Sequence, residues 1–350
     1  SNTAATNIAI IFAFLMSSQF TYSLLPHQDT GVPSKVMKDL LAGGTFLESI
    51  AKVPYEWKSF TTQATAQSDY SSKTREIVAD VFARQNANLS ASEEDSLRAL
   101  RNGALTITTG HQLMICGGTV FFEAKVLGAV ALAKAASVAL GIKVVPIFWM
   151  ATEDHDFEEI SSFQIGEYKF TWRQPDAKGP VGWLPTDSLA DQLESWLESV
   201  PLNAAQKELL QPRLQAYKEC ENLAEATRQW VRQWAEGLGL LVLDGQDVSL
   251  KAAAEPLWRE EMKGVYSKLI KKQTEALVEH GYKAQVFPRE INLFDLRDGD
   301  RQRFEQADHQ CPSLHISPNA LMRPLYQEFL LPNLAYVGGG GELAYWLQLG

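Results

Sequence analysis

Cysteine is scarce in this sequence. Cys116, Cys220 and Cys311 are the only three in 350 residues, and they lie far apart in the chain. An odd number at such spacings argues against a disulfide framework and against a paired-cysteine metal motif. Reduced thiols are typical of cytoplasmic proteins, so we expect a cytoplasmic location.

Positive charge is also in short supply. The chain has 32 Lys and Arg against 42 Asp and Glu, for a formal net charge of −10. This balance argues against a nucleic-acid backbone or an anionic membrane as the main partner. It leaves room for a local basic pocket that binds a small anion.

No apolar run is long enough to span a bilayer, which takes about 20 residues. The longest, "IAIIFAFLM" at residues 8–16, is nine residues long, and no Lys or Arg precedes it. The charged start of a signal peptide is therefore absent. We interpret the run as an extension or a buried segment, with a cleaved signal as the alternative.

Apolar residues, in contrast, are plentiful. They make up 45% of the chain, enough for a substantial core. Residues 104–109 ("ALTITT") predict a strand, residues 119–141 an apolar helix, and residues 143–151 ("KVVPIFWMA") a second strand. Strand, helix and strand in this order form a βαβ unit, which implies an α/β fold with parallel strands. Further strands are predicted at 238–245 and 333–339.

The rest of the chain predicts mostly helices. Residues 1–100 are interpreted as an N-terminal extension and a helical lead-in, and residues 101–350 as the core. Within the core, about 187–237 has the pattern of a helical insertion. Residues 252–281 predict a long helical stretch, and 291–305 a hairpin or turn.

The first motif, "TTGHQ" at residues 108–112, follows a predicted strand. In open α/β sheets ligands bind at the carboxyl ends of strands, and Gly110, Gly117 and Gly118 would let the backbone approach an anion. His111 and Gln112 add polar side chains there. The segment is neither the dinucleotide fingerprint nor a P-loop. A tight strand-to-helix turn is the alternative.

The second motif, "ATEDHDFEEI", follows the second strand and should lie beside the first. Its ionisable residues are Glu153, Asp154, His155 and Asp156. Clustered carboxylates need a compensating partner, and a histidine beside a carboxylate can act as a general base. A metal site and a solvated acidic turn are the alternatives.

The third motif occupies residues 317–349. Arg323 suits a carboxylate through its forked guanidinium, and Gln327 follows one helical turn later. The run Gly338–Gly341 comes between a strand and a helix and could form a backbone nest for an anion. A surface ion pair and a flexible linker are the alternatives. Arg297 is a weaker candidate in an ordinary turn.

Together these segments resemble the cysteine ligases of bacillithiol biosynthesis (the BshC family). The resemblance is carried by "TTGHQ", "VPIFWMATEDHDFEE" and "SPNALMRPLYQEFLLPNLAYVGGGGELAYWLQL", with the weaker "YSLLPHQDTG" near the start. The second and third are long and specific, and the segments span nearly the whole chain. The sequence departs from the family pattern at His111, where glutamine is usual, at Gly117–Gly118, where Gly-Pro is usual, and at Gly340, where proline is common.

The resemblance implies a Rossmann-like parallel-sheet core with helical connecting insertions and a C-terminal coiled-coil helix. Family members continue beyond the end of this sequence, so it also implies a truncated chain without the coiled coil. A homodimer contact could lie in that part.

The activity that the resemblance implies is the last step of bacillithiol biosynthesis. The carboxyl of L-cysteine would be joined to the amine of glucosaminyl-malate, with ATP as the expected activating cofactor and the need for a metal left open. The expected catalytic residues are His111, Asp154, His155 and Asp156. The expected binding residues are Gly110, Gln112, Glu153, Arg323, Gln327, Gly338, Gly339, Gly341 and Glu342. Two other functions fit the motifs: a metal-dependent hydrolase using Glu153–Asp156, and a non-catalytic nucleotide- or sugar-binding module.

Overall fold

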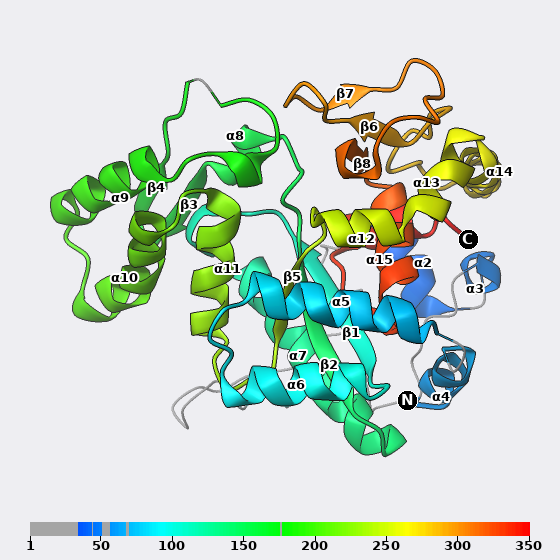
Figure 1. The fold of residues 1–350 in the computed structure, drawn as a ribbon, viewed down its shortest axis with the longest axis horizontal. Coiled ribbons are helices and arrows are strands. Elements are labelled where there is room, and N and C mark those ends of the chain that lie inside the picture. The colour runs from blue at the N-terminus through cyan, green and yellow to red at the C-terminus, as the bar shows by residue number, and fades with distance from the viewer. Residues whose placement is uncertain (1–33, 44, 51–56, 68–69, 176) are drawn as a thin grey trace.

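The computed structural model describes residues 34–350 except 44, 51–56, 68–69 and 176. The apolar run at 8–16 lies outside the described residues. A parallel sheet forms the centre of the fold, with strand order β5-β2-β1-β9 (Figure 1). Its strands are β1 (Leu105–His111), β2 (Val144–Met150), β5 (Leu241–Asp244) and β9 (Asn333–Tyr336). The α/β prediction is confirmed.

The two central strands are in register along their whole length. Leu105 of β1 pairs with Val144 of β2, and His111 at the end of β1 pairs with Met150. Nearly every residue of both strands is buried, as expected for a sheet that is covered on both faces. The register brings the motifs that follow the two strands to the same edge of the sheet.

Helices cover both faces of the sheet. Alternate side chains of a strand point to opposite faces. Ile147 and Trp149 belong to the core under α5 (Ser72–Gln85) and α6 (Ala91–Arg101), whereas Phe148 and Met150 pack in the core that contains α7 (Val120–Leu140). The βαβ unit β1–α7–β2 therefore has the predicted form.

The lead-in is helical, as predicted. Ser90 begins α6 with a capping box, in which its hydroxyl accepts from the Glu93 N–H and the Glu93 carboxylate accepts from the Ser90 N–H. Among the described residues, the helices before α5 are α2 (Lys35–Ala42), α3 (Leu47–Ile50) and α4 (Trp57–Ala66).

Residues 157–234 form a lobe at one side of the sheet (Figure 1, green). A hairpin of β3 (Ser162–Ile165) and β4 (Tyr168–Thr171) precedes three helices, and these helices form the predicted helical insertion. The helical elements of this lobe are α8 (Phe157–Ile160), a 3-10 turn (Val181–Trp183), α9 (Asp187–Ser199), α10 (Ala204–Glu219) and α11 (Leu223–Trp234).

The long helical stretch predicted for 252–281 is divided. Pro256 starts a new helix because proline has no N–H to continue the previous one, and Gly264 adopts a left-handed conformation with φ of 72°. The separate helices are α12 (Val248–Ala253), α13 (Glu255–Met262) and α14 (Val265–Glu279).

A small antiparallel sheet, in the order β7-β6-β8, packs above the carboxyl edge of the main sheet (Figure 1). The predicted hairpin forms its first part. Its strands are β6 (Leu293–Asp295), β7 (Gln302–Arg303) and β8 (Ile316–Pro318), and the last follows a 3-10 turn (Ser313–His315). The chain then enters α15 (Met322–Leu330), β9 and α16 (Gly340–Trp346).

All three cysteines are free thiols. Within the described part of the chain, no helix combines the length and the apolarity needed to cross a membrane.

Candidate active site

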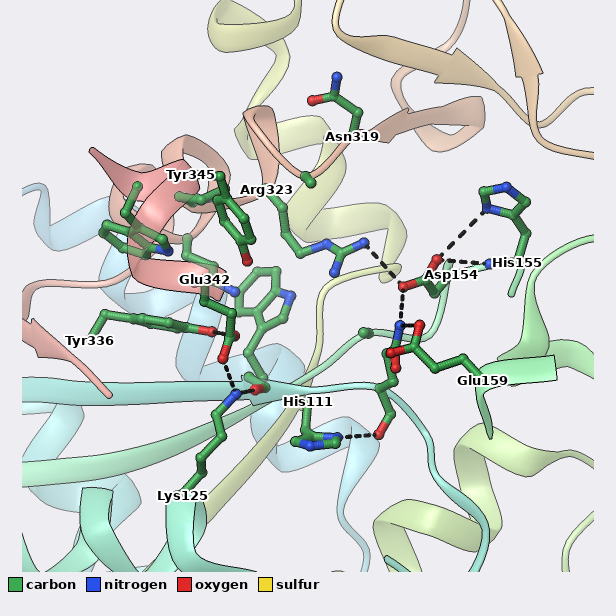
Figure 2. A pocket seen from close by; sticks show the side chains of 18 of the residues that line it. His111, Lys125, Asp154, His155, Glu159, Asn319, Arg323, Tyr336, Glu342 and Tyr345 are labelled. Carbon is green, nitrogen blue, oxygen red and sulfur yellow. Dashed lines mark hydrogen bonds and ion pairs between the residues drawn. The ribbon is translucent and has the colours of Figure 1, made fainter. Parts of the chain in front are cut away.

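A cavity of about 480 Å³ lies at the carboxyl edge of the main sheet (Figure 2). It joins the ends of β1 and β2 to α7, α15, β9 and α16, and the loop before β7 closes one side. His111, His155 and Arg323 all line this cavity, so the three motifs meet at one site as predicted. The other predicted residues in its lining are Gly110, Gln112, Asp154, Gln327 and Glu342.

The end of β1 contributes His111 in a defined tautomer. Its Nδ1 lies 3.1 Å from the backbone oxygen of Gln112, and because a carbonyl only accepts, Nδ1 carries the proton. Burial, and then the nearby charge of Lys125, lowers the pKa of His111. The imidazole is therefore neutral at pH 7, with Nε2 unprotonated.

A side chain at Gly110 would be crowded. A Cβ at this position would lie 3.1 Å from the Tyr336 hydroxyl and 3.4 Å from the Trp149 oxygen. Gly117 and Gly118 instead have positive φ values of 87° and 65° and do not line the cavity. They shape the turn into α7, so the turn interpretation holds for these two glycines.

Asp154 projects into the cavity from the loop after β2. Its Oδ1 accepts the backbone N–H of His155 at 3.0 Å, and its Oδ2 accepts the Gln112 amide at 3.3 Å. Burial by itself would raise the pKa of Asp154, but Arg323 and Arg301 outweigh burial and hold it below its usual value. Asp154 is thus an ionised carboxylate near neutral pH.

Two arginines approach Asp154 from different elements. Arg323 comes from α15, and its Nη2 lies 3.9 Å from Asp154 Oδ2 (Figure 2). Its guanidinium makes no hydrogen bond with any described residue. Arg301 comes from the loop before β7 and donates to the Ser317 hydroxyl and the Pro318 oxygen. Burial and then the charge of Arg323 lower the pKa of Arg301 to about 10, which leaves both arginines charged.

His155 is exposed, with 56% of its side chain accessible. Its Nδ1 lies 3.3 Å from Arg301 Nη1. An arginine only donates, so Nδ1 is the acceptor and the neutral ring carries its proton on Nε2. In this arrangement His155 has no free nitrogen lone pair for a substrate proton.

A second ionic group closes the opposite end of the cavity. Lys125 of α7 donates to the Gly110 oxygen and to the Glu342 carboxylate. Glu342 also accepts the Tyr336 hydroxyl at 2.6 Å and the Gly339 N–H at 2.8 Å. The Glu342 carboxylate therefore has its partners within the protein.

Glu153 and Asp156 do not reach the cavity, which corrects their predicted roles. Glu153 forms an ion pair with Lys251, a fully buried side chain that also donates to the Ile316 oxygen at 2.7 Å. Asp156 caps α8 by accepting the Glu159 N–H at 3.1 Å. Successive residues of the loop point in different directions, so the acidic cluster is divided among three environments.

The glycine run does not form an anion nest, and this is a second correction. Gly338, Gly339, Gly340 and Gly341 all lack the positive φ that a nest requires, and none lines the cavity. The Gly339 N–H is occupied by Glu342. A Cβ at Gly338 would lie 2.9 Å from the Tyr336 ring, so close packing explains this glycine.

Several residues of the cavity were not predicted from the sequence: Lys125, Trp149, Glu159, Phe294, Arg301, Asn319, Tyr336, Tyr345 and Trp346. Lys125 had a usable signal, because it is a lone cation in the apolar first turns of a helix that begins at the ligand edge. Arg301 had none, since "RDGDRQRF" has the composition of a surface turn.

The acidic and histidine side chains of the described residues do not form a metal site. Among the described residues, no three His, Cys, Asp or Glu side chains are grouped so that they could hold an ion. Glu153 and Asp156 are engaged elsewhere, as shown above. The metal-dependent hydrolase therefore has no ligand set in the cluster from which it was inferred.

Comparisons with known proteins agree with the fold. Residues 21–313 and 306–350 match the family model described as "Bacillithiol biosynthesis BshC, N-terminal Rossmann-like domain". A "Putative cysteine ligase BshC" of Flavobacterium johnsoniae is 35% identical over 93% of this chain and 66% of its own length. Proteins of the same name from Flavobacterium psychrophilum and Cytophaga hutchinsonii are 33% and 32% identical, over 93% and 95% of this chain and 66% of each relative. The chain thus spans about two thirds of the length of these relatives.

Proposed function

The chain belongs to the BshC family, and from this premise we propose that it acts in bacillithiol biosynthesis as a ligase. The proposed reaction joins the carboxyl of L-cysteine to the amine of glucosaminyl-malate. The observation that carries the proposal is Asp154, an ionised carboxylate held between Arg301 and Arg323 in a cavity of small-molecule size. A cavity of about 480 Å³ suits metabolites of this class.

Amide formation requires the attacking amine to lose a proton. Of the predicted acceptors, Asp156 caps a helix and His155 has its Nδ1 at Arg301. Asp154 and the neutral His111 both line the cavity, and we assign Asp154 as the proton acceptor because it lies beside the two arginines proposed to hold the substrate. The Gln112 amide orients Asp154, and neutral His111 adds no competing positive charge.

The arginines suit the anionic part of the substrates. Arg323 has a guanidinium without a hydrogen bond to the described protein, so its donors are available to a ligand. Arg301 is already fixed by Ser317 and Pro318, which pre-organises its charge beside Arg323. In our proposal the two arginines hold the malate carboxylates.

The cysteine carboxylate also needs a leaving group, and ATP is the proposed source. ATP would supply activation by converting the carboxylate into an adenylate or an acyl phosphate. The guanidinium donors of Arg323 and Arg301 match phosphate oxygens as well as carboxylates, so they would hold the nucleotide phosphates during activation and the malate carboxylates in the later amide-forming step. The Gly338–Gly341 segment does not fit this role, because its conformation offers no nest.

The proposed partners are small molecules: L-cysteine, glucosaminyl-malate and a nucleotide. We propose that the reaction takes place in the cytoplasm and that the protein works as a homodimer. Sedimentation of the full chain would test the second point.

The experiment combines the protein with cysteine and glucosaminyl-malate, with and without ATP, and detects the joined thiol by mass spectrometry. Asp154→Asn should lower kcat by roughly 100-fold or more, as for loss of a general base. Asp156→Asn is the matched control: it makes the same change two residues away, and asparagine is also a good helix cap. Product formation without ATP would contradict the activation step alone.

The rival function is a nucleotide- or sugar-binding module without turnover. It predicts that ligands bind but that no joined thiol forms under any condition. In that case Asp154→Asn would change only affinity. Equal product formation by wild type and Asp154→Asn would instead contradict Asp154 as the proton acceptor.

A further inference from the structure

His155, Asp154 and Arg301 form a triangle at one side of the cavity. His155 Nδ1 lies 3.3 Å from Arg301 Nη1 and 3.7 Å from Asp154 Oδ1. Arg301 Nη1 lies 3.9 Å from the same Asp154 oxygen. Figure 2 shows the Asp154 carboxylate between Arg323 and His155. One imidazole nitrogen therefore faces a guanidinium and a carboxylate at similar distances.

A neutral imidazole pairs with the arginine. Because a guanidinium only donates, His155 Nδ1 accepts from Arg301 and the ring carries its proton on Nε2. Arg301 also donates to the Ser317 hydroxyl and the Pro318 oxygen, so three partners hold it in place. In this state the imidazole makes no hydrogen bond with the Asp154 carboxylate, which keeps its capacity to accept a proton.

A protonated imidazole would take the other partner. Its Nδ1 becomes a donor, which cannot accept from Arg301 and is repelled by the guanidinium charge. The Asp154 carboxylate is the acceptor within reach, and the two would form an ion pair. A carboxylate beside a cation binds a proton less readily, so Asp154 would become a weaker base.

Solvent can supply the proton that exchanges these partners. His155 is exposed, whereas Arg301 and Asp154 are largely covered. Histidine is the side chain that ordinarily changes its charge between about pH 5 and 8. The protonation state of His155 can therefore follow the pH of the solution while its two neighbours stay charged.

The other charged groups nearby do not compete for the imidazole. These residues are Glu153, Asp156, Glu159, Arg289 and Arg323. None of them forms an ion pair with His155 in the part of the chain that the structure describes. The remaining contact from the small sheet is the apolar ring of Phe294, whose centroid lies 6.4 Å from that of the imidazole. Asp154 and Arg301 thus decide how His155 is paired.

We propose that His155 is a positioning residue for the ligation. Its neutral form holds Arg301 and leaves Asp154 able to accept the proton of the attacking amine, and its protonated form pairs with Asp154 instead. This inference rests on the proposed function, in which Asp154 is the proton acceptor. His155 exchanges its own proton with water and takes none from the substrate.

The pH dependence of kcat tests the proposal, with the full chain, cysteine, glucosaminyl-malate and ATP. His155→Asn is the conservative variant, because asparagine places its Oδ1 near the position of the histidine Nδ1 and does not titrate. From about pH 7.5 to 5.5, kcat of the wild type should fall roughly tenfold relative to that of His155→Asn. The substrate amine and His111 titrate in both proteins and cancel in this ratio.

Two further variants complete the series. His155→Leu cannot accept from Arg301, so at about pH 7.5 its kcat should be roughly three- to tenfold below that of His155→Asn. His309→Asn makes the conservative change at an exposed histidine outside the cavity, and its pH profile should match the wild type. The same pH profile for wild type and His155→Asn, or equal rates for the Asn and Leu variants, would overturn the inference.

Nitrogen NMR of histidine-labelled protein tests the pairing without turnover. The His155 ring, identified by the loss of its signals in His155→Asn, should carry its proton on Nε2 at neutral pH, and Arg301→Met should weaken this preference. His111, whose Nδ1 faces the Gln112 oxygen, should show the opposite tautomer in the same spectrum. A His155 proton on Nδ1 would contradict the inference even in an active enzyme.

The two measurements separate the two levels of the argument. If the unaltered chain forms no joined thiol, the proposed function fails, and the NMR result still decides whether His155 is paired with Arg301. If the thiol forms but the kcat ratio does not change with pH, the positioning role of His155 fails and the proposed function stands.

Discussion

Two charge clusters lie next to each other after β2, and they differ in where their hydrogen bonds go. In the buried cluster, Glu153 pairs with Lys251, which has no exposed surface and donates further to the Ile316 and Leu314 backbone oxygens. In the cavity cluster, Arg301 Nη1 and Arg323 Nη2 each lie 3.9 Å from a carboxylate oxygen of Asp154, which is beyond hydrogen-bond distance. The two carboxylates are adjacent in the chain and belong to different environments.

The difference separates charges that hold the fold from charges that can hold a ligand. Lys251 joins α12 to β8 and to the loop after β2, so it fixes the small sheet against the main one. Arg323 has no hydrogen bond to the described protein through its guanidinium and remains free to bind. We therefore expect changes in the first cluster to alter stability and changes in the second to alter affinity.

The largest effect is expected from Lys251→Met. It leaves the Glu153 carboxylate, whose side chain is only 12% exposed, without its counter-charge, which should lower the free energy of unfolding by about 3–5 kcal/mol. Urea denaturation measures this change. Adding Glu153→Gln should recover a large part of the loss, because it removes the unpaired charge.

The exposed pair Lys263–Glu260, 2.7 Å apart, provides the control. Lys263→Met makes the same substitution at the surface and should cost about 0.5 kcal/mol or less. A similar small loss for Lys251→Met would remove the distinction between the two clusters.

Arg323→Met should give the second largest effect, on affinity. Loss of charge-assisted hydrogen bonds should weaken binding of glucosaminyl-malate by roughly 10- to 100-fold, while stability changes by less than about 1 kcal/mol. Calorimetry and thermal unfolding measure the two quantities. Arg297→Met is the control, because Arg297 is an exposed arginine paired with Asp295 and Asp308 outside the cavity. A large loss of stability with unchanged affinity would reverse the assignment.

Asp154→Asn should change how the free energy of unfolding depends on pH in the acid range. The folded-state pKa of Asp154 is below its ordinary value, so its contribution is present above the unfolded pKa and is lost as the pH falls through the folded pKa. Between about pH 5 and the acid limit, the variant should therefore lose less free energy of unfolding than the wild type. If the free energy of unfolding fell equally with pH in the variant and the wild type, the arginines would not stabilise this carboxylate.

His111→Gln should give the smallest effect. The folded-state pKa of His111 is lowered, so the wild type loses stability as the pH falls below about 6.5, and a glutamine cannot contribute to this loss. Below about pH 6.5, the free energy of unfolding of the variant should depend less on pH than that of the wild type. Glu328, whose pKa burial raises to about 7, titrates in both proteins and cancels in the comparison. A steeper curve for the variant would contradict the neutral form of His111.

The position of the site could be predicted because it depends on strand order and direction. Parallel strands end at one edge, so the segments after β1 and β2 had to meet, and His111 and Asp154 were found in this way. Arg301 could not be found, since it reaches His155 across 146 positions of sequence from a segment with the composition of a turn. Glu153 was wrongly assigned to the site because a loop, unlike a helix or a strand, has no regular repeat of side-chain direction. The sequence therefore could not show which residue of the loop faces the cavity.

The sequence by itself determined the α/β fold, the βαβ unit and the edge at which a ligand would bind. These follow from apolar periodicity and from glycine and proline, which act over a few neighbouring residues. The tertiary structure alone decided the partner of each charge: Lys251 for Glu153, 98 positions away, and Arg323 for Asp154. The physical reason is that the energy of a charge depends on its solvation and its neighbours in space, and folding sets both.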